Sequence, residues 1–204
     1  MLQSTVRPYV IKQRTIGAGN GRSKGTSVVL GIDPGTLSTG FAVIMRHQNS
    51  QRLLGCGTIR NVSSASMPLR LKRIYTELSA IIDKYHPDEL AIESAFYGKN
   101  AQSALKLGHA RGIAILAAVM NEIPTTEYSP REVKKAVVGN GAASKDQVQF
   151  MVKSMLRISN TKMLHDTSDA IAIAICHLHR LLTPTSKHKD WKSFVDAHPE
   201  RVRT

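Results

Sequence analysis

Apolar runs separated by turn-forming residues predict strands in the first part of the chain. Residues 28–32 form a β-branched run that ends at Asp33, directly before Pro34 and Gly35, and a second run covers 41–45. Two short apolar runs on either side of such a turn are typical of a hairpin of buried strands. The same pattern predicts three further strands, at 53–59, 89–92 and 125–128.

Other apolar positions recur with the period of a helix. Within 68–85, Leu71, Ile74 and Leu78 lie about one turn apart, and they form one face of an amphipathic helix that ends before Pro87. Long or periodic apolar segments predict three more helices, at Ala101–Asn121, Arg131–Val138 and, with Ser144 as its N-cap, Ser144–Leu156.

The last apolar segment, His165–Leu182, fits two periods. Ile171, Ile173 and Ile175 alternate with alanine, as they would in a strand. The segment is long, rich in alanine and begins with capping residues at Thr167 and Ser168, which favours a buried helix. We therefore predict a helix here.

The resulting order is three strands, helix, strand, helix, strand and then helices. This order predicts an α/β fold in which a five-stranded mixed sheet is flanked by helices. The chain has 204 residues, enough for one domain with a substantial core. We place that domain at 28–183, between a basic arm at 1–27 and a basic tail at 184–204.

The charge pattern predicts a polyanionic partner. The formal net charge is +13, and only part of the excess lies in the arm, which holds five Lys or Arg residues and no acid. Such a balance favours binding to nucleic acid. We interpret the arm as a disordered segment that contacts DNA, although its composition also fits an organellar transit peptide or translation from an upstream start site.

The cysteines and the apolar runs bear on the compartment. Cys56 and Cys176 each lie inside an apolar stretch, which argues against a disulfide framework or a zinc site. No apolar run reaches the roughly 18 residues that a membrane span needs. We therefore expect a soluble protein in a reducing compartment, the cytoplasm.

Four acidic residues occupy positions that the predicted topology brings together. Asp33 and Glu93 end predicted strands, while Asp166 and Asp169 are three residues apart at the start of the last helix. Strand ends at one sheet edge converge, and an i,i+3 pair shares one helix face. At 4 Å and an effective dielectric of 20, each like-charged pair costs about 4 kcal/mol. Two Mg²⁺ or Mn²⁺ ions would relieve this repulsion and favour phosphodiester hydrolysis.

Taken singly, each acid also fits a structural role. Asp33 can form a turn before Pro34, Glu93 can pair with a lysine, and Asp166 and Asp169 can cap a helix. Spacing alone leaves both interpretations open.

Several short motifs follow one another along about 28–182, the whole predicted domain. They are Gly31–Thr36 (GIDPGT), Thr39–Phe41 (TGF), Ala91–Glu93 (AIE) with Phe96, Lys99 and Asn100, Asn100–Gly112, Val137–Gly139 and Asp166–Ala170. Together and in this order, they resemble the motifs of one family, the RuvC Holliday-junction resolvases.

The resemblance implies a ribonuclease-H-like fold and a homodimer that resolves four-way DNA junctions in recombination and repair. It implies paired, symmetric, Mg²⁺-dependent nicks that leave 5′-phosphate and 3′-hydroxyl ends, with RuvA and RuvB as possible partners. By position, Asp33, Glu93, Asp166 and Asp169 match the metal-binding, catalytic acids. Some members carry His in place of Asp166, so whether Asp166 or the preceding His165 completes the site stays open.

The resemblance also indicates residues that face DNA. Phe96 matches an aromatic that stacks on bases at the opened junction, and Tyr97 is an alternative for this role. Lys134 and Lys145 match lysines near the scissile phosphate. Lys99 and Arg111 are further candidates for phosphate contacts.

The assembly prediction rests on symmetry, because two like strands must be cut at symmetric points. A two-fold homodimer is expected, and its interface is placed on Ala101–Asn121, where Gly108 and Gly112 permit close approach. Two other functions remain as alternatives: an ATP-binding domain of the actin-like or sugar-kinase type, which shares the GIDPGT motif, and a non-catalytic nucleic-acid-binding module. The four acids argue against the second, and the chain has no second phosphate loop for the first.

Overall fold

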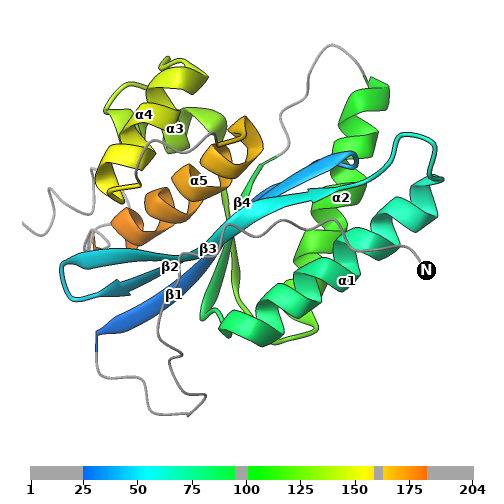
Figure 1. Cartoon of the computed structure of the whole chain (residues 1–204), viewed down its shortest axis with the longest axis horizontal. Coiled ribbons are helices and arrows are strands. Elements are labelled where there is room, and N and C mark those ends of the chain that lie inside the picture. Colours follow the sequence, from blue (N-terminus) through cyan, green and yellow to red (C-terminus); the bar gives the residue numbers. More distant parts are fainter. Residues whose placement is uncertain (1–24, 95–100, 159–162, 183–204) are drawn as a thin grey trace, which may run out of the picture.

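A five-stranded mixed sheet forms the centre of the computed structural model, which describes residues 25–94, 101–158 and 163–182 (Figure 1). The strand order is β3-β2-β1-β4-β5. Strands β1 (Thr26–Asp33), β2 (Ser38–His47) and β3 (Ser50–Arg60) form an antiparallel meander. Strands β4 (Glu89–Glu93) and β5 (Thr125–Tyr128) extend the sheet in parallel with β1. The predicted five-stranded mixed sheet is confirmed.

Helices cover both faces of this sheet. Helices α1 (Met67–Tyr85) and α2 (Ala101–Val119) lie on one face. Helices α3 (Pro130–Val138), α4 (Lys145–Met155) and α5 (His165–Leu182) lie on the other (Figure 1). The two faces form separate apolar cores because side chains alternate along a strand: in β1, Leu30 and Ile32 belong to one core and Val29 to the other.

Helix α5 confirms the prediction of a helix over the competing strand period. Its Ile171, Ile173 and Ile175 are all buried, because α5 contacts β1 and β2 on one side and α3 and α4 on the other. A helix that is covered on nearly every side can place isoleucine at every second position without exposing any of them. The alternation in the sequence therefore reflects burial and not a strand.

Among the described residues, the glycines on α2 make no close approach to another element. A Cβ atom added at Gly108 or Gly112 would meet no atom of this part of the chain within 4 Å. Close approaches do occur where α5 crosses β1 and β2, at Gly31 and Gly40. These two glycines therefore allow α5 to pack tightly on the sheet.

The predicted arm and tail lie outside the described residues apart from 25–27. Strand β1 begins inside the arm's predicted range, at Thr26. In the described ranges, no helix is both long and apolar enough to span a membrane.

Candidate active site

Two of the predicted acids lie side by side at one edge of the sheet. The parallel register pairs Ile32 of β1 with Ile92 of β4, so the next residues, Asp33 and Glu93, end neighbouring strands at the same edge. Both strands are buried up to this point, and both acidic residues are only partly accessible. The fold thus fixes these two side chains through the central strands of the sheet.

The other two acids are brought to this edge by the close seating of α5 on β1 and β2. An added Cβ at Gly40 would lie 1.9 Å from the backbone oxygen of Asp166, and one at Gly31 would lie 2.3 Å from that of Ala170. Only glycine allows these contacts. Because Gly40 is paired with Asp33 in the β1–β2 register, the first turn of α5 lies directly beside the end of β1.

Two hydroxyl groups of the sheet hold the first turn of α5. The Ser38 hydroxyl, at the start of β2, donates a hydrogen bond to Oδ2 of Asp166. The Oγ1 atoms of Thr58 on β3 and Thr167 on α5 lie 2.9 Å apart in a buried contact. Ser38 was not among the predicted site residues, because the sequence around a serine at the start of a strand does not indicate a partner 128 residues away.

The charges of the other three predicted acids act on the carboxyl group of Asp33. Burial, followed by the charges of Glu93, Asp169 and Asp166, raises the pKa of Asp33 from 3.8 to about 8. Burial and then Asp169 also raise the pKa of Glu93. Desolvation and like charge both disfavour ionised carboxylates. The structure therefore brings all four predicted acids into one negatively charged site.

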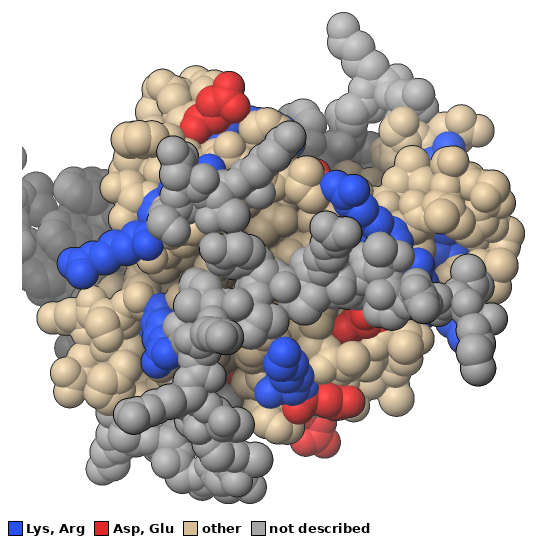
Figure 2. All heavy atoms as spheres, in the orientation of Figure 1, with Lys and Arg blue, Asp and Glu red and all other residues tan. Residues whose placement is uncertain are grey.

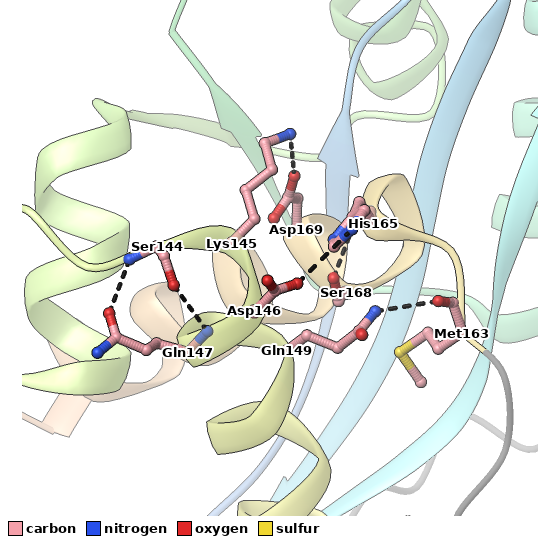
Figure 3. Close-up of polar contacts among 9 residues, drawn as sticks. All are labelled: Ser144, Lys145, Asp146, Gln147, Gln149, Met163, His165, Ser168 and Asp169. Atoms are coloured by element: carbon pink, nitrogen blue, oxygen red, sulfur yellow. Dashed lines mark hydrogen bonds and ion pairs between the residues drawn. The ribbon is translucent and has the colours of Figure 1, made fainter.

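Lys145 supplies part of the counter-charge. Its Nζ lies 3.0 Å from Oδ2 of Asp169 (Figure 3), and this hydrogen bond is the main cause of the raised pKa of Lys145. Lys145 is the first residue of α4, whose start is held by a capping box: the Ser144 hydroxyl accepts from Gln147 N–H, and the Gln147 side chain accepts from Ser144 N–H. The cap thus directs the lysine toward the acids.

Lys134 lies within electrostatic range of the same site. Its charge lowers the pKa of Glu93 against the larger effect of burial. It is carried by α3, whose own capping box joins Ser129 and Glu132. Lys135, the next residue, is exposed, and its charge has no part in the pKa shifts of Asp33 and Glu93.

The remaining predicted residues lie elsewhere or outside the described ranges. The side chain of His165 is half exposed, and its Nε2 lies 3.9 Å from Oδ1 of Asp146 on α4, as Figure 3 shows. Arg111 forms an ion pair with Glu127 on β5. Phe96, Tyr97 and Lys99 lie outside the described residues, so their roles stay predictions.

The donor chemistry fits a hard divalent cation. All four acids offer carboxylate oxygens, the ligands that Mg²⁺ and Mn²⁺ prefer, and the raised pKa of Asp33 marks a charge that the protein alone does not neutralise. Among the described residues, no three His, Cys, Asp or Glu side chains are already close enough to hold one ion.

One face of the molecule carries mixed charge. Figure 2 shows Lys and Arg side chains at several separate places on the face of Figure 1, with a few acids between them.

Both cysteines, Cys56 and Cys176, are buried and free, in agreement with the prediction that neither belongs to a disulfide.

Comparison with known proteins identifies the family. A family model described as "Crossover junction endodeoxyribonuclease RuvC" matches residues 29–177. The protein of that name from Salinibacter ruber is 44% identical over 176 residues, which cover 86% of this chain and 98% of the relative. The one from Vibrio cholerae is 53% identical over 151 residues, which cover 74% and 86%.

Solved structures agree with this assignment. The structure described as "T. thermophilus RuvC in complex with Holliday junction substrate" matches with a TM-score of 0.72 and 29% identity, covering 76% of this chain and 94% of the other. A second Thermus thermophilus RuvC structure matches with a TM-score of 0.70 and 30% identity, covering 76% and 97%. The ribonuclease-H-like fold that the sequence predicted is thereby confirmed. Fold, motifs and relatives agree, and the chain belongs to the RuvC family of crossover junction endodeoxyribonucleases, which are metal-dependent nucleases.

Proposed function

We propose that this protein resolves four-way DNA junctions in recombination and repair by paired, symmetric nicks that leave 5′-phosphate and 3′-hydroxyl ends. The observation that carries the proposal is the meeting of Asp33 and Glu93, at adjacent strand ends, with Asp166 and Asp169 on α5. It is supported by the family assignment and by the related Thermus thermophilus RuvC structure in complex with a Holliday junction substrate.

The four carboxylates are the residues that would hold the metal, two Mg²⁺ ions for which Mn²⁺ can substitute. When bound, two such ions activate a water and stabilise the leaving oxygen of a phosphodiester. Burial disfavours the charge of Asp33, and a bound cation would compensate for this. Lys145 and Lys134 lie beside this cluster and act near the scissile phosphate.

The other DNA contacts follow from the sequence. Phe96 stacks on a base at the opened junction centre, and Lys99 in the same segment binds a phosphate. Arg111 has to exchange its ion pair with Glu127 for a phosphate oxygen before it can contribute. The basic excess of the whole chain, +13, supplies non-specific attraction to the junction arms.

The exposed face of α2 supports a two-fold homodimer. Leu105, Leu116 and Met120, at its end, are 62%, 46% and 65% exposed. The buried residues of this helix are all alanines: Ala110, Ala114, Ala117 and Ala118. A helix that buries alanine and exposes leucine is expected to bury those exposed side chains against a second apolar surface. The open space at Gly108 and Gly112 allows a second copy of the chain to approach the helix backbone. Two active sites related by this axis would cut two like strands.

Incubation with a mobile four-way junction, with and without Mg²⁺, tests the function directly. We expect symmetric cuts on two strands of like polarity, only with the metal, and no ATP hydrolysis. Junction binding without metal-dependent cutting would show a binding module instead, and ATP turnover in the absence of DNA would show an actin-like or sugar-kinase activity. RuvA and RuvB as partners, and the cytoplasm as location, are further parts of the proposal.

A further inference from the structure

We propose that Ser38 is a positioning residue for the nuclease reaction, because its hydroxyl holds the Asp166 carboxylate in the orientation in which that carboxylate binds the cation. The inference rests on the proposed function and adds a residue to it. Ser38 Oγ, at the start of β2, donates a hydrogen bond to Oδ2 of Asp166, which lies in the first turn of α5. A hydrogen bond to one oxygen restricts the rotation of the carboxylate and thereby the positions open to Oδ1.

The chain on both sides of Ser38 is held by hydrogen bonds. On one side of Ser38, the backbone oxygen of Leu37 accepts from Asn61 N–H at 2.9 Å. On the other side, Thr39 is buried, and its Oγ1 donates to the backbone oxygen of Gly35 at 2.6 Å. Ser38 therefore projects from a segment whose neighbours are anchored, unlike a serine on a free surface loop.

The backbone of Asp166 is fixed as well, by its contact with Gly40. What remains free is the rotation of the Asp166 side chain. An aspartate in the first turn of a helix is attracted to the free N–H groups of its own helix. The Ser38 hydroxyl offers a competing donor on β2, the strand paired with β1 and Asp33. The bond thus holds the carboxylate against β2, the strand paired with β1.

The adjacent His165 shows the opposite behaviour. Figure 3 shows its ring directed toward Asp146 on α4, at 3.9 Å, and its side chain is 49% exposed. Of these two neighbouring residues, only Asp166 has a partner from β2 among the contacts that the structure describes. This contact with β2 favours Asp166 over His165 as the residue that completes the site.

The test measures metal binding without DNA. Mn²⁺ affinity is followed by electron paramagnetic resonance for wild type, Ser38→Ala and Ser38→Thr. Partners that orient metal ligands typically contribute 10–100-fold to affinity, so we expect Ser38→Ala to bind Mn²⁺ about tenfold more weakly, with Ser38→Thr close to wild type. Ser50→Ala, which removes an exposed hydroxyl from the start of β3, is the matched control and should bind like wild type.

Cleavage and binding assays complete the test. Ser38→Ala should need about tenfold more Mg²⁺ for half-maximal cleavage, with nearly wild-type rate at saturation and unchanged junction affinity. Unchanged or tighter Mn²⁺ binding by Ser38→Ala would overturn the inference, because the hydroxyl would then be neutral or would withhold Asp166 from the metal.

A double-mutant cycle separates this inference from the proposed function. In Asp166→Asn, removal of the Ser38 hydroxyl should have no further effect on Mn²⁺ affinity, since the two residues act as one unit. If Asp166→Asn binds Mn²⁺ and cleaves like wild type, the proposed role of Asp166 fails. If Asp166→Asn loses both while Ser38→Ala retains both, only the role of Ser38 fails.

Discussion

The phenolic oxygen of Tyr128 lies 2.7 Å from Nδ1 of His177, in a buried contact that joins the end of β5 to the middle of α5. The other ring nitrogen, Nε2, lies 2.9 Å from Oε2 of Glu89. Burial lowers the pKa of His177 against the opposing effect of Glu89. The ring is therefore neutral near pH 7, with Nε2–H donating to Glu89 and the Tyr128 hydroxyl donating to Nδ1.

This arrangement predicts a loss of stability in mild acid. Below pH 6.5, His177 becomes protonated in the unfolded chain but not in the folded protein. The free energy of unfolding therefore decreases as the pH is lowered, by up to about 1.4 kcal/mol per pH unit. In His177→Gln this part of the slope should vanish, as measured by urea unfolding at several pH values. An equal slope in His177→Gln and wild type would contradict the prediction.

The acids give a prediction on cleavage and DNA binding together. Asp33→Asn, Glu93→Gln and Asp169→Asn should lose junction cleavage but retain junction binding, since each removes a metal ligand and no phosphate contact. Asp166→Asn should be similarly impaired, whereas Asp166→His should retain part of the activity. Gel-shift and nicking assays on one junction measure both properties, and wild-type cutting by any of the Asn or Gln variants would remove that acid from the site.

Asp33 has a further effect in the absence of metal. Its pKa is about 8 in the folded protein against an ordinary value of 3.8 for the unfolded chain, so the folded state loses stability as pH rises between these values. The buried carboxyl group of Asp33 is mostly ionised at pH 9. Asp33→Asn should therefore have a higher Tm than wild type at pH 9 in EDTA, and added Mg²⁺ should narrow the gap by stabilising only the wild type. A lower Tm for the variant would show that the buried charge does not destabilise the fold.

The two lysines near the acids should affect rate more than affinity. Removing one group that stabilises developing charge typically costs about 10²-fold, so we expect a loss of this order for Lys145→Ala and a smaller one for Lys134→Ala. Each should also reduce the salt dependence of junction binding by about one counterion. Lys135→Ala is the matched control on α3 and should cleave at the wild-type rate. If Lys135→Ala cleaves as slowly as Lys134→Ala, the effect does not depend on the proximity of Lys134 to the acids.

The glycines separate packing within one subunit from packing between subunits. Gly40→Ala should destabilise the domain by about 1–3 kcal/mol and reduce cleavage, because its Cβ would collide with the backbone of Asp166. In Gly112→Ala the added methyl meets open space in one subunit, where it should favour the helix by about 1 kcal/mol.

Any loss in Gly112→Ala must therefore arise in the dimer. Light scattering should show a weakened dimer, together with uncoupled single nicks on a cruciform plasmid. A fully dimeric Gly112→Ala with paired nicking would place the interface away from α2.

The sequence predicted the elements because most have a simple amphipathic pattern and clear turns, and β5 and α5 begin and end at the predicted residues. It predicted the meeting of the four acids because strand ends and helix starts are set by local sequence. The Ser38–Asp166 bond, the Arg111–Glu127 pair and the seating of α5 on Gly31 and Gly40 were not predicted. These depend on how distant elements cross, which local patterns do not encode.

The burial of α5 determines how the enzyme can lose its activity. Eleven of the residues of this helix, between Thr167 and Leu178, are buried between the sheet and two other helices, so the amide hydrogens of this part should exchange with solvent only when the whole domain unfolds. Asp169 lies within this part and Asp166 directly precedes it, so release of either acid should require disruption of the packing of α5. A partly opened protein would therefore not retain a loosened active site that nicks DNA indiscriminately; the nuclease is either assembled or absent.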